Sequence, residues 1–223
     1  MSFVSMSKPR DLPSPAIGHR DLMLATPGKL FSAKGWIFEL KHDGFRCLIT
    51  KRGDLVRLES RSGRDMSPCF PEIVDELRPI RAAFIADSEL VVLDDQGRPI
   101  WERLTARHVI KNPARIRQAA AQDPAAIFAF DLLWLNGADF RPRPLLERKA
   151  ALHGVLPANR RVRYAAHFND DSADLWKLAV AMELEGIVAK DAASVYSAGR
   201  STRWQKIKTD AGAERERKRR PSR

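Results

Sequence analysis

A single lysine at the junction of two apolar segments constrains this chain most. Lys41 follows residues 36–40 and precedes Asp43 and Gly44, after which residues 45–50 resume a strand-like pattern. An enzyme that uses lysine as a nucleophile must lower its pKa by burial or by a nearby positive charge. A strand end suits this task, because the backbone is fixed, Gly44 allows close approach, and Asp43 can accept a proton or hold a cation. The same residues would also fit an ordinary surface Lys–Asp pair before a hairpin.

Further motifs in the later chain decide between these two interpretations. In order they read ELKHDGFR at 39–46, SRSG at 60–63, DSE at 87–89, FDLL at 130–133, EGIVAK at 185–190 and WQKIK at 204–208. They resemble motifs I, Ia, III, IIIa, IV and V of the covalent nucleotidyltransferases, which comprise ATP-dependent DNA ligases, RNA ligases and mRNA-capping enzymes. Residues 194–201 are most similar to the ligase half of the bacterial end-joining enzymes called DNA ligase D.

The resemblance implies an α+β fold in which antiparallel sheets are flanked by helices and ATP binds between the sheets. Periodicity predicts a hairpin over 45–60 with its turn at Gly53 and Asp54, helices at 70–77, 145–156 and 172–184, and strands at 84–93, 127–135, 185–190 and 203–208. Alternation predicts that Phe128, Phe130, Leu132 and Trp134 share one side of their strand. Neither a Rossmann glycine motif nor a P-loop motif occurs in the sequence.

Composition changes along the chain and predicts its organisation. We expect a flexible lead-in at 1–20, one adenylation domain at 21–209, a basic disordered tail at 210–223, and no OB-fold domain within the sequence. The tail would be either simply solvated or a nonspecific DNA contact. Cys47 and Cys69 are too few for a disulfide framework or a zinc site, so both are interpreted as packing residues.

The charge balance favours a polyanionic partner. The chain carries 39 Lys and Arg against 28 Asp and Glu, a formal net charge of +11. It has no apolar run of the roughly 18–20 residues that a membrane span requires, and no signal-peptide pattern. We therefore expect a cytoplasmic monomer, in the bacterial cytosol or nucleoid, that acts on nicked duplex DNA, with a separate OB-fold or end-joining protein as a possible partner.

The resemblance assigns roles to individual residues. Lys41 would be the nucleophile that forms a lysyl-AMP, and Lys206 and Lys208 would face the α-phosphate. Glu185 would hold a divalent metal, Mg²⁺ or Mn²⁺, because hard oxygen ligands suit such ions. The AMP contacts implied for the remaining residues are Glu39 at the adenine edge, Phe130 stacked on the base, Arg46 and Glu89 at the ribose and phosphate, and Arg61 at the ribose or the 5′-phosphate of the nick.

Two features qualify this picture. Ser88 stands where the family usually has glycine, which would place a hydroxymethyl group near the ribose. Strand-edge charges such as Glu39 and Arg46 could also serve only to keep the surface hydrated. The function implied is ATP-dependent joining of 5′-phosphate and 3′-hydroxyl ends in nicked DNA during repair. The alternatives are an RNA-directed ligase of the same superfamily and a non-catalytic DNA-end-binding scaffold.

Overall fold

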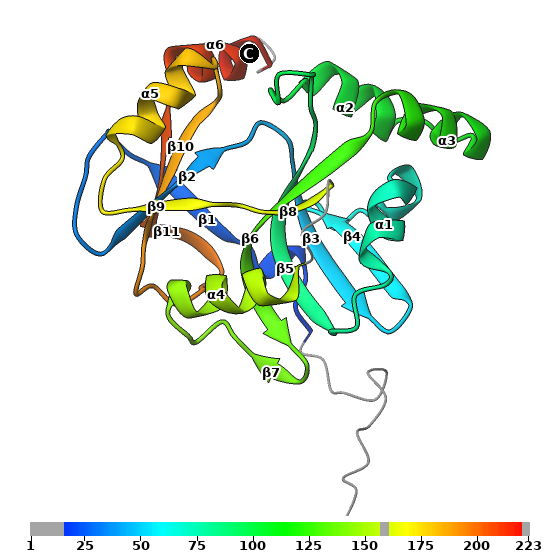
Figure 1. The fold of residues 1–223 in the computed structure, drawn as a ribbon, viewed down its shortest axis with the longest axis horizontal. Helices are drawn as coiled ribbons and strands as arrows, with labels where there is room; N and C mark the ends of the chain where they lie inside the picture. Colours follow the sequence, from blue (N-terminus) through cyan, green and yellow to red (C-terminus); the bar gives the residue numbers. More distant parts are fainter. Residues whose placement is uncertain (1–15, 157–160, 220–223) are drawn as a thin grey trace, which may run out of the picture.

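The described residues of the computed structural model are 16–156 and 161–219, and they form two sheets that stand side by side (Figure 1). The first sheet contains, in spatial order, β1 (Met23–Pro27), β11 (Gly199–Lys208), β10 (Gly186–Asp191), β2 (Trp36–Lys41) and β9 (His167–Asn169). The second contains β4 (Leu55–Ser60), β3 (Phe45–Arg52), β5 (Phe84–Val92), β6 (Ala125–Leu135) and β7 (Ala138–Asp139), with β8 (Val162–Tyr164) paired to β6. Pairing is antiparallel except for β1 with β11 and β6 with β8, which confirms the α+β class with mainly antiparallel sheets.

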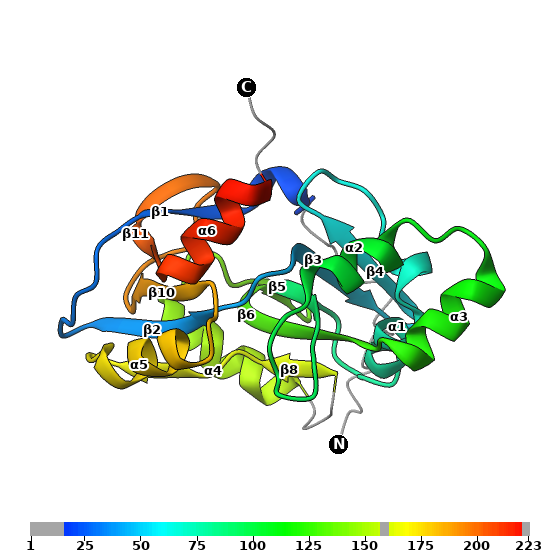
Figure 2. The ribbon, with the colours of Figure 1, turned by 90° about the horizontal axis from the view of Figure 1, so that it is seen from above.

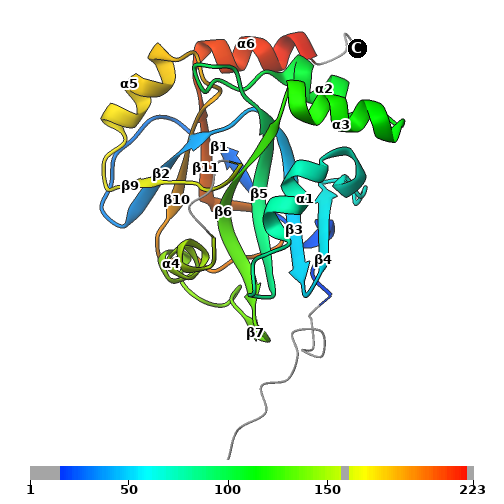
Figure 3. The ribbon, with the colours of Figure 1, turned by 45° about the vertical axis from the view of Figure 1, so that its right-hand side comes forward.

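Helices pack around the two sheets (Figure 3). They are α1 (Pro71–Leu77), α2 (Trp101–His108), α3 (Pro113–Gln122), α4 (Leu145–Val155), α5 (Ala173–Ala181) and α6 (Asp210–Arg219), with short 3₁₀ turns at His19–Asp21 and Ser67–Cys69. Leu175 and Ala179 of α5 pack on Phe38 and Ile187 of the first sheet. Ile73 and Leu77 of α1 join the core of the second sheet, as their helical spacing predicts. Among the described residues, no helix is long and apolar enough to span a membrane.

A third apolar cluster joins the two sheets. It includes Met23, Ile37, Leu48, Trp134 and Trp204, which come from strands of both sheets. Residues 161–169 also cross from one sheet to the other, since β8 pairs with β6 and β9 pairs with β2. The sheets are therefore held together along part of their length.

Strand β6 departs from simple alternation. Its pairing with β5 shifts between Ile85 and Ala86 and again between Asp87 and Ser88, so β6 carries an extra residue at each place. Leu132, which lies between the two irregularities, packs in the core of the second sheet, whereas Phe130 and Trp134 pack in the cluster between the sheets. The prediction that Leu132 shares a side with Phe130 was wrong, because each bulge reverses the side that faces the core.

The C-terminal segment is also ordered where disorder was predicted. Residues 210–219 form α6, and Thr209 starts the helix by accepting a hydrogen bond from the Gly212 amide at its hydroxyl, 3.1 Å away. Asp210 lies in the first turn and basic residues lie in the last, an arrangement that favours the helix dipole. The guanidinium of Arg219 then pairs with Asp43 at 2.6 and 2.8 Å. Figure 2 shows α6 beside the strands of the first sheet and reaching toward α2.

The predicted lead-in is only partly described. Residues 1–15 and 220–223 lie outside the described residues. Ile17, by contrast, is buried in the cluster between the sheets, and both His19 Nδ1 and the His19 amide contact Glu59, at 2.7 and 2.9 Å. The flexible segment predicted for 1–20 therefore does not extend through residues 17–20. Cys47 and Cys69 are both buried and free, as predicted.

Candidate active site

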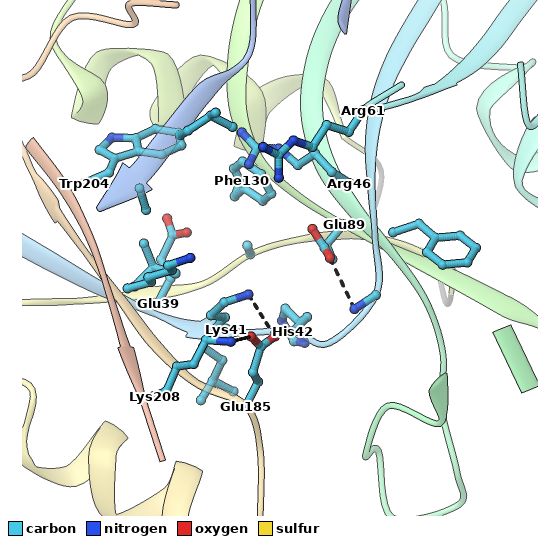
Figure 4. Close-up of a pocket in the computed structure, with 18 of the residues that line it drawn as sticks. Glu39, Lys41, His42, Arg46, Arg61, Glu89, Phe130, Glu185, Trp204 and Lys208 are labelled. Atoms are coloured by element: carbon cyan, nitrogen blue, oxygen red, sulfur yellow. Dashed lines mark hydrogen bonds and ion pairs between the residues drawn. The ribbon is translucent and has the colours of Figure 1, made fainter. Parts of the chain in front are cut away.

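A cleft of about 840 Å³ opens between the two sheets (Figure 4). All nine side chains that the sequence analysis selected line it: Glu39, Lys41, Arg46, Arg61, Glu89, Phe130, Glu185, Lys206 and Lys208. They come from seven different elements or their ends, so the fold gathers residues that are up to 169 positions apart, from Glu39 to Lys208. Ser88 is not among them. It is buried and donates a hydrogen bond to the Cys47 carbonyl at 2.5 Å, so its hydroxymethyl group packs inside the protein and does not line the cleft.

Strand register brings three charged groups together at one end of the cleft. Lys41 and Lys208 both lie opposite Gly186, one on each neighbour of β10. The carboxylate of Glu185 accepts from Lys41 Nζ at 2.8 Å and from Lys208 Nζ at 2.7 Å. The predicted nucleophile, the predicted metal ligand and one predicted phosphate contact thus form one hydrogen-bonded group, in which two ammonium groups share a carboxylate.

The pKa values of the two motif V lysines shift in opposite directions. Burial lowers the pKa of Lys206, and the positive charges of Lys208 and Lys41 lower it further. Burial acts on Lys208 in the same direction, but its hydrogen bonds and ion pairs with Glu185 and Glu216 outweigh burial and raise its pKa. Both side chains line the cleft, because residues two apart on one strand point to the same face of the sheet.

Arg46 is held against the wall of the cleft by a partner that the sequence analysis did not select. Its guanidinium donates to both oxygens of the buried Asp87 at 2.5 Å and also to the Met23 carbonyl at 2.9 Å. Tyr196 donates its hydroxyl to the same carboxylate at 2.5 Å. The guanidinium lies 4.8 Å from the centre of the Phe130 ring. Arg46 is therefore oriented by a buried acid and an aromatic face before any ligand binds.

Glu89 of β5 lies directly opposite Arg46 of β3 in the register of the two antiparallel strands. Its carboxyl group accepts a hydrogen bond from the Gly44 amide at 3.2 Å. Burial raises the pKa of Glu89 to about 7, and the nearby positive charges do not offset this. A Cβ atom at position 44 would lie 2.2 Å from the Leu90 carbonyl oxygen of β5. The close approach of the segment before β3 to β5 therefore requires glycine at this position.

The other end of the cleft is aromatic. The rings of Phe130 and Trp204 meet edge to face with centroids 6.1 Å apart, and Lys190 Nζ lies 4.3 and 4.2 Å from their centres. Lys190 also donates to Glu39 at 2.7 Å. In Figure 4, Phe130 and Trp204 lie on one side of Glu39, while Lys41, Glu185 and Lys208 lie on the other. The cleft therefore has a flat apolar end and a cationic end, which suits a nucleotide.

His42 lines the cleft directly after Lys41 and was not among the predicted site residues. Its ring stacks on Phe128 with centroids 3.7 Å apart and planes 12° apart. Burial lowers the pKa of His42 to about 4, and the charges of Lys41 and Arg163 act in the same direction. The imidazole is therefore neutral near pH 7 and adds no positive charge beside Lys41.

The acidic residues of the cleft suit a metal ion that is bound partly by the protein and partly by the phosphates of a nucleotide. Among residues 16–156 and 161–219, no group of three or more His, Cys, Asp and Glu side chains could hold a metal alone. Glu185 and Glu89 line the same cleft, and Glu185 is among the charges that act on Glu89. Mg²⁺ typically takes one or two carboxylates and completes its shell with water and phosphate oxygens. The donor set therefore suits Mg²⁺ bound together with a polyphosphate.

Comparison with known proteins defines the class. The ligase domain of M. tuberculosis LigD superposes with a TM-score of 0.70 at 28% identity over 84% of this chain and 60% of that one. Mycobacterial DNA ligase D complexed with ATP and MES gives a TM-score of 0.66 at 29% identity, over 84% and 60% of the two chains. The fold is accordingly that of the nucleotidyltransferase domains of DNA ligases, as the resemblance implied.

Sequence comparison then identifies the family. The family model described as ATP dependent DNA ligase domain matches residues 23–208. DNA ligase B of Mycobacterium tuberculosis is 35% identical over 176 residues, which cover 77% of this chain and 34% of the relative. The chain belongs to the ATP-dependent DNA ligase domain family, and it spans about a third of the length of the curated relatives that it matches.

Proposed function

We propose that this chain catalyses ATP-dependent joining of 5′-phosphate and 3′-hydroxyl ends in nicked duplex DNA, in the cytosol or nucleoid. The observation that carries the proposal is the group formed by Lys41, Glu185 and Lys208 at the cationic end of a cleft whose other end is aromatic. A non-catalytic DNA-binding scaffold would need basic surface, but it would have no use for an acid held between two cleft lysines.

In the first step, ATP lies with its base against Phe130 and its phosphates toward Lys206 and Lys208. Neutral Lys41 Nζ attacks the α-phosphorus, so that an N–P bond forms while the bond to the bridging oxygen breaks and pyrophosphate leaves with the electron pair. The proton that Lys41 must lose has a nearby acceptor in Glu185, 2.8 Å away. Positive groups at the phosphates stabilise the charge that accumulates there.

A divalent metal bound through Glu185 would add positive charge at the phosphates and the leaving group. Lys41 and Lys208 each bind one carboxylate oxygen of Glu185 in this structure. At least one of these two hydrogen bonds would have to break or lengthen for Glu185 to bind the metal. In the later steps AMP passes to the 5′-phosphate of the nick, and the 3′-hydroxyl then displaces it. Arg61, which is exposed at the edge of the cleft, has the planar fork of donors that suits that phosphate.

Covalent labelling tests the proposal. Incubation with α-labelled ATP and Mg²⁺ should transfer label to the protein, and Lys41→Ala should abolish it. Lys177→Ala is the matched control, because Lys177 is a surface lysine with 76% of its side chain exposed and should label fully. Full labelling of Lys41→Ala would exclude Lys41 as the nucleophile. A wild-type protein that binds nicked DNA and never takes label would be a scaffold.

A further inference from the structure

The carboxylate of Glu39 is fixed from behind by a residue outside the cleft. Lys149 of α4 donates to Glu39 Oε1 at 2.5 Å, and its ammonium also donates to the Ala165 carbonyl at 3.0 Å. Lys190 of β10 holds Glu39 Oε2 at 2.7 Å. Lys149 is fully buried and does not line the cleft, whereas Glu39, Lys190 and Ala165 do.

This arrangement fixes both the position and the charge of Glu39. Burial alone would raise the pKa of Glu39, but the charges and hydrogen bonds of Lys149 and Lys190 outweigh it, so the pKa is lowered. An ionised carboxylate can only accept hydrogen bonds, whereas a protonated one can also donate. Each oxygen keeps a further lone pair after binding one lysine, so Glu39 presents an acceptor, and no donor, beside the aromatic end of the cleft.

We propose that Lys149 is a positioning residue that sets nucleobase selectivity through Glu39. This inference rests on the proposed function, because it concerns the base of the nucleotide used there. The 6-amino group of adenine donates to the fixed carboxylate. The 6-oxo group of guanine brings a second acceptor to the same place and leaves two acceptors facing each other. Selectivity for a 6-amino purine therefore depends on a lysine that never touches the base.

The proposal is tested by changing the nucleotide and the protein, first separately and then together. The substrate change replaces ATP with purine riboside triphosphate, which lacks the 6-amino group. The protein change is Lys149→Met, which keeps the length of the side chain and removes its charge. The measurement is kcat/KM for formation of the covalent nucleotide adduct, followed by intact mass, with the full 223-residue chain. Wild type should prefer ATP by about tenfold or more, the usual effect of a hydrogen bond to a charged group.

In Lys149→Met this preference should fall to about twofold or less, and discrimination against GTP should fall with it. Lys149→Arg keeps the positive charge and should keep most of the preference. Arg148→Met is the matched control. Arg148 is the preceding residue of α4, equally buried, but pairs with Asp131 at 2.7 and 2.8 Å. The Arg148→Met substitution should lower thermal stability but leave unchanged the ratio of kcat/KM for ATP to kcat/KM for purine riboside triphosphate.

Two outcomes would overturn the proposal. One is a Lys149→Met protein that loses activity equally with both nucleotides, since that is the behaviour of a purely structural residue. The other is a wild-type protein that does not distinguish the two nucleotides. If wild type forms no adduct at all, the proposed function fails. In that case, calorimetry measures the equilibrium affinities of the same two nucleotides for the same variants. The ratio of these affinities then replaces the ratio of kcat/KM values, and the proposal stands only if the preference for ATP falls in Lys149→Met.

Discussion

At the scale of single residues, three charged groups in the cleft walls are paired before a ligand arrives. Arg46 has Asp87, Glu39 has two lysines, and Glu185 has Lys41 and Lys208. A buried charge without a partner is costly, so such pairing lets a strongly polar cleft exist within a stable fold. Glu89 differs, because the hydrogen bond to its carboxyl group comes from an uncharged backbone amide.

Glu89 should make stability depend on pH. Its pKa is about 7 in the folded protein against about 4.5 when unfolded, so the folded state binds more protons between these values. The free energy of unfolding should therefore fall as pH rises from about 4.5 to 7. Glu89→Gln should remove this slope and be the more stable protein above pH 7, by up to about 3 kcal/mol. Urea unfolding at pH 5 and pH 8 checks this. An equal effect of the substitution at both pH values would contradict it.

At the scale of elements, α6 is attached to the strand end that carries the central acid. Thr209 donates its hydroxyl to the Leu184 carbonyl at 2.6 Å, and its amide donates to the Glu185 carbonyl at 3.2 Å. Gly212 packs directly on the backbone of Glu185, where an added Cβ would meet the carbonyl oxygen at 2.2 Å. The helix and Glu185 therefore share one rigid contact.

Gly212→Ala should break this contact. Neither backbone can give way cheaply, so we expect a loss of about 1–3 kcal/mol in the free energy of unfolding, the usual cost of overpacking. Gly154→Ala is the control, because an added Cβ there meets nothing within 4 Å and the helix α4 should gain about 0.5–1 kcal/mol. Urea unfolding of both variants gives the comparison. Equal stability of the two variants would show that α6 does not pack as described.

What could be predicted from sequence follows from how local each signal is. The β3–β4 hairpin was predicted because its turn and alternation lie within 16 residues, and Lys41, Glu185 and Lys208 were selected because their motifs are short. Strand alternation with Val188 could also have found Lys190, which lines the cleft. Lys149 had no such signal, since its partner Glu39 is 110 positions away. The bulges in β6 and the docking of α6 likewise depend on neighbours distant in sequence.

At the scale of the whole molecule, the excess of basic residues should govern binding to DNA. With a formal net charge of +11, association with nicked duplex should weaken steeply with salt, because phosphate contacts release counterions. Each lost phosphate contact lowers the slope of log K against log salt by about one. Arg61→Gln should show this decrease, whereas Lys177→Gln, on an exposed surface of α5 that does not line the cleft, should not. Titration of labelled nicked DNA between about 50 and 200 mM salt measures it. An unchanged slope for Arg61→Gln would remove Arg61 from the phosphate contacts.

The contact made by the last residue of α6 has an optical consequence. The guanidinium of Arg219 pairs with Asp43, two residues after Lys41, and also lies 4.2 Å over the ring of Trp101, the first residue of α2. Helix α6, which follows the last strand of the first sheet, therefore contacts a tryptophan whose ring also packs on Phe45 of the second sheet, with centroids 5.1 Å apart. Indole emission responds to a charge against the ring, so a motion that separates α6 from α2 would change the environment of Trp101. The emission of Trp101 would therefore report whether α6 and α2 remain in contact.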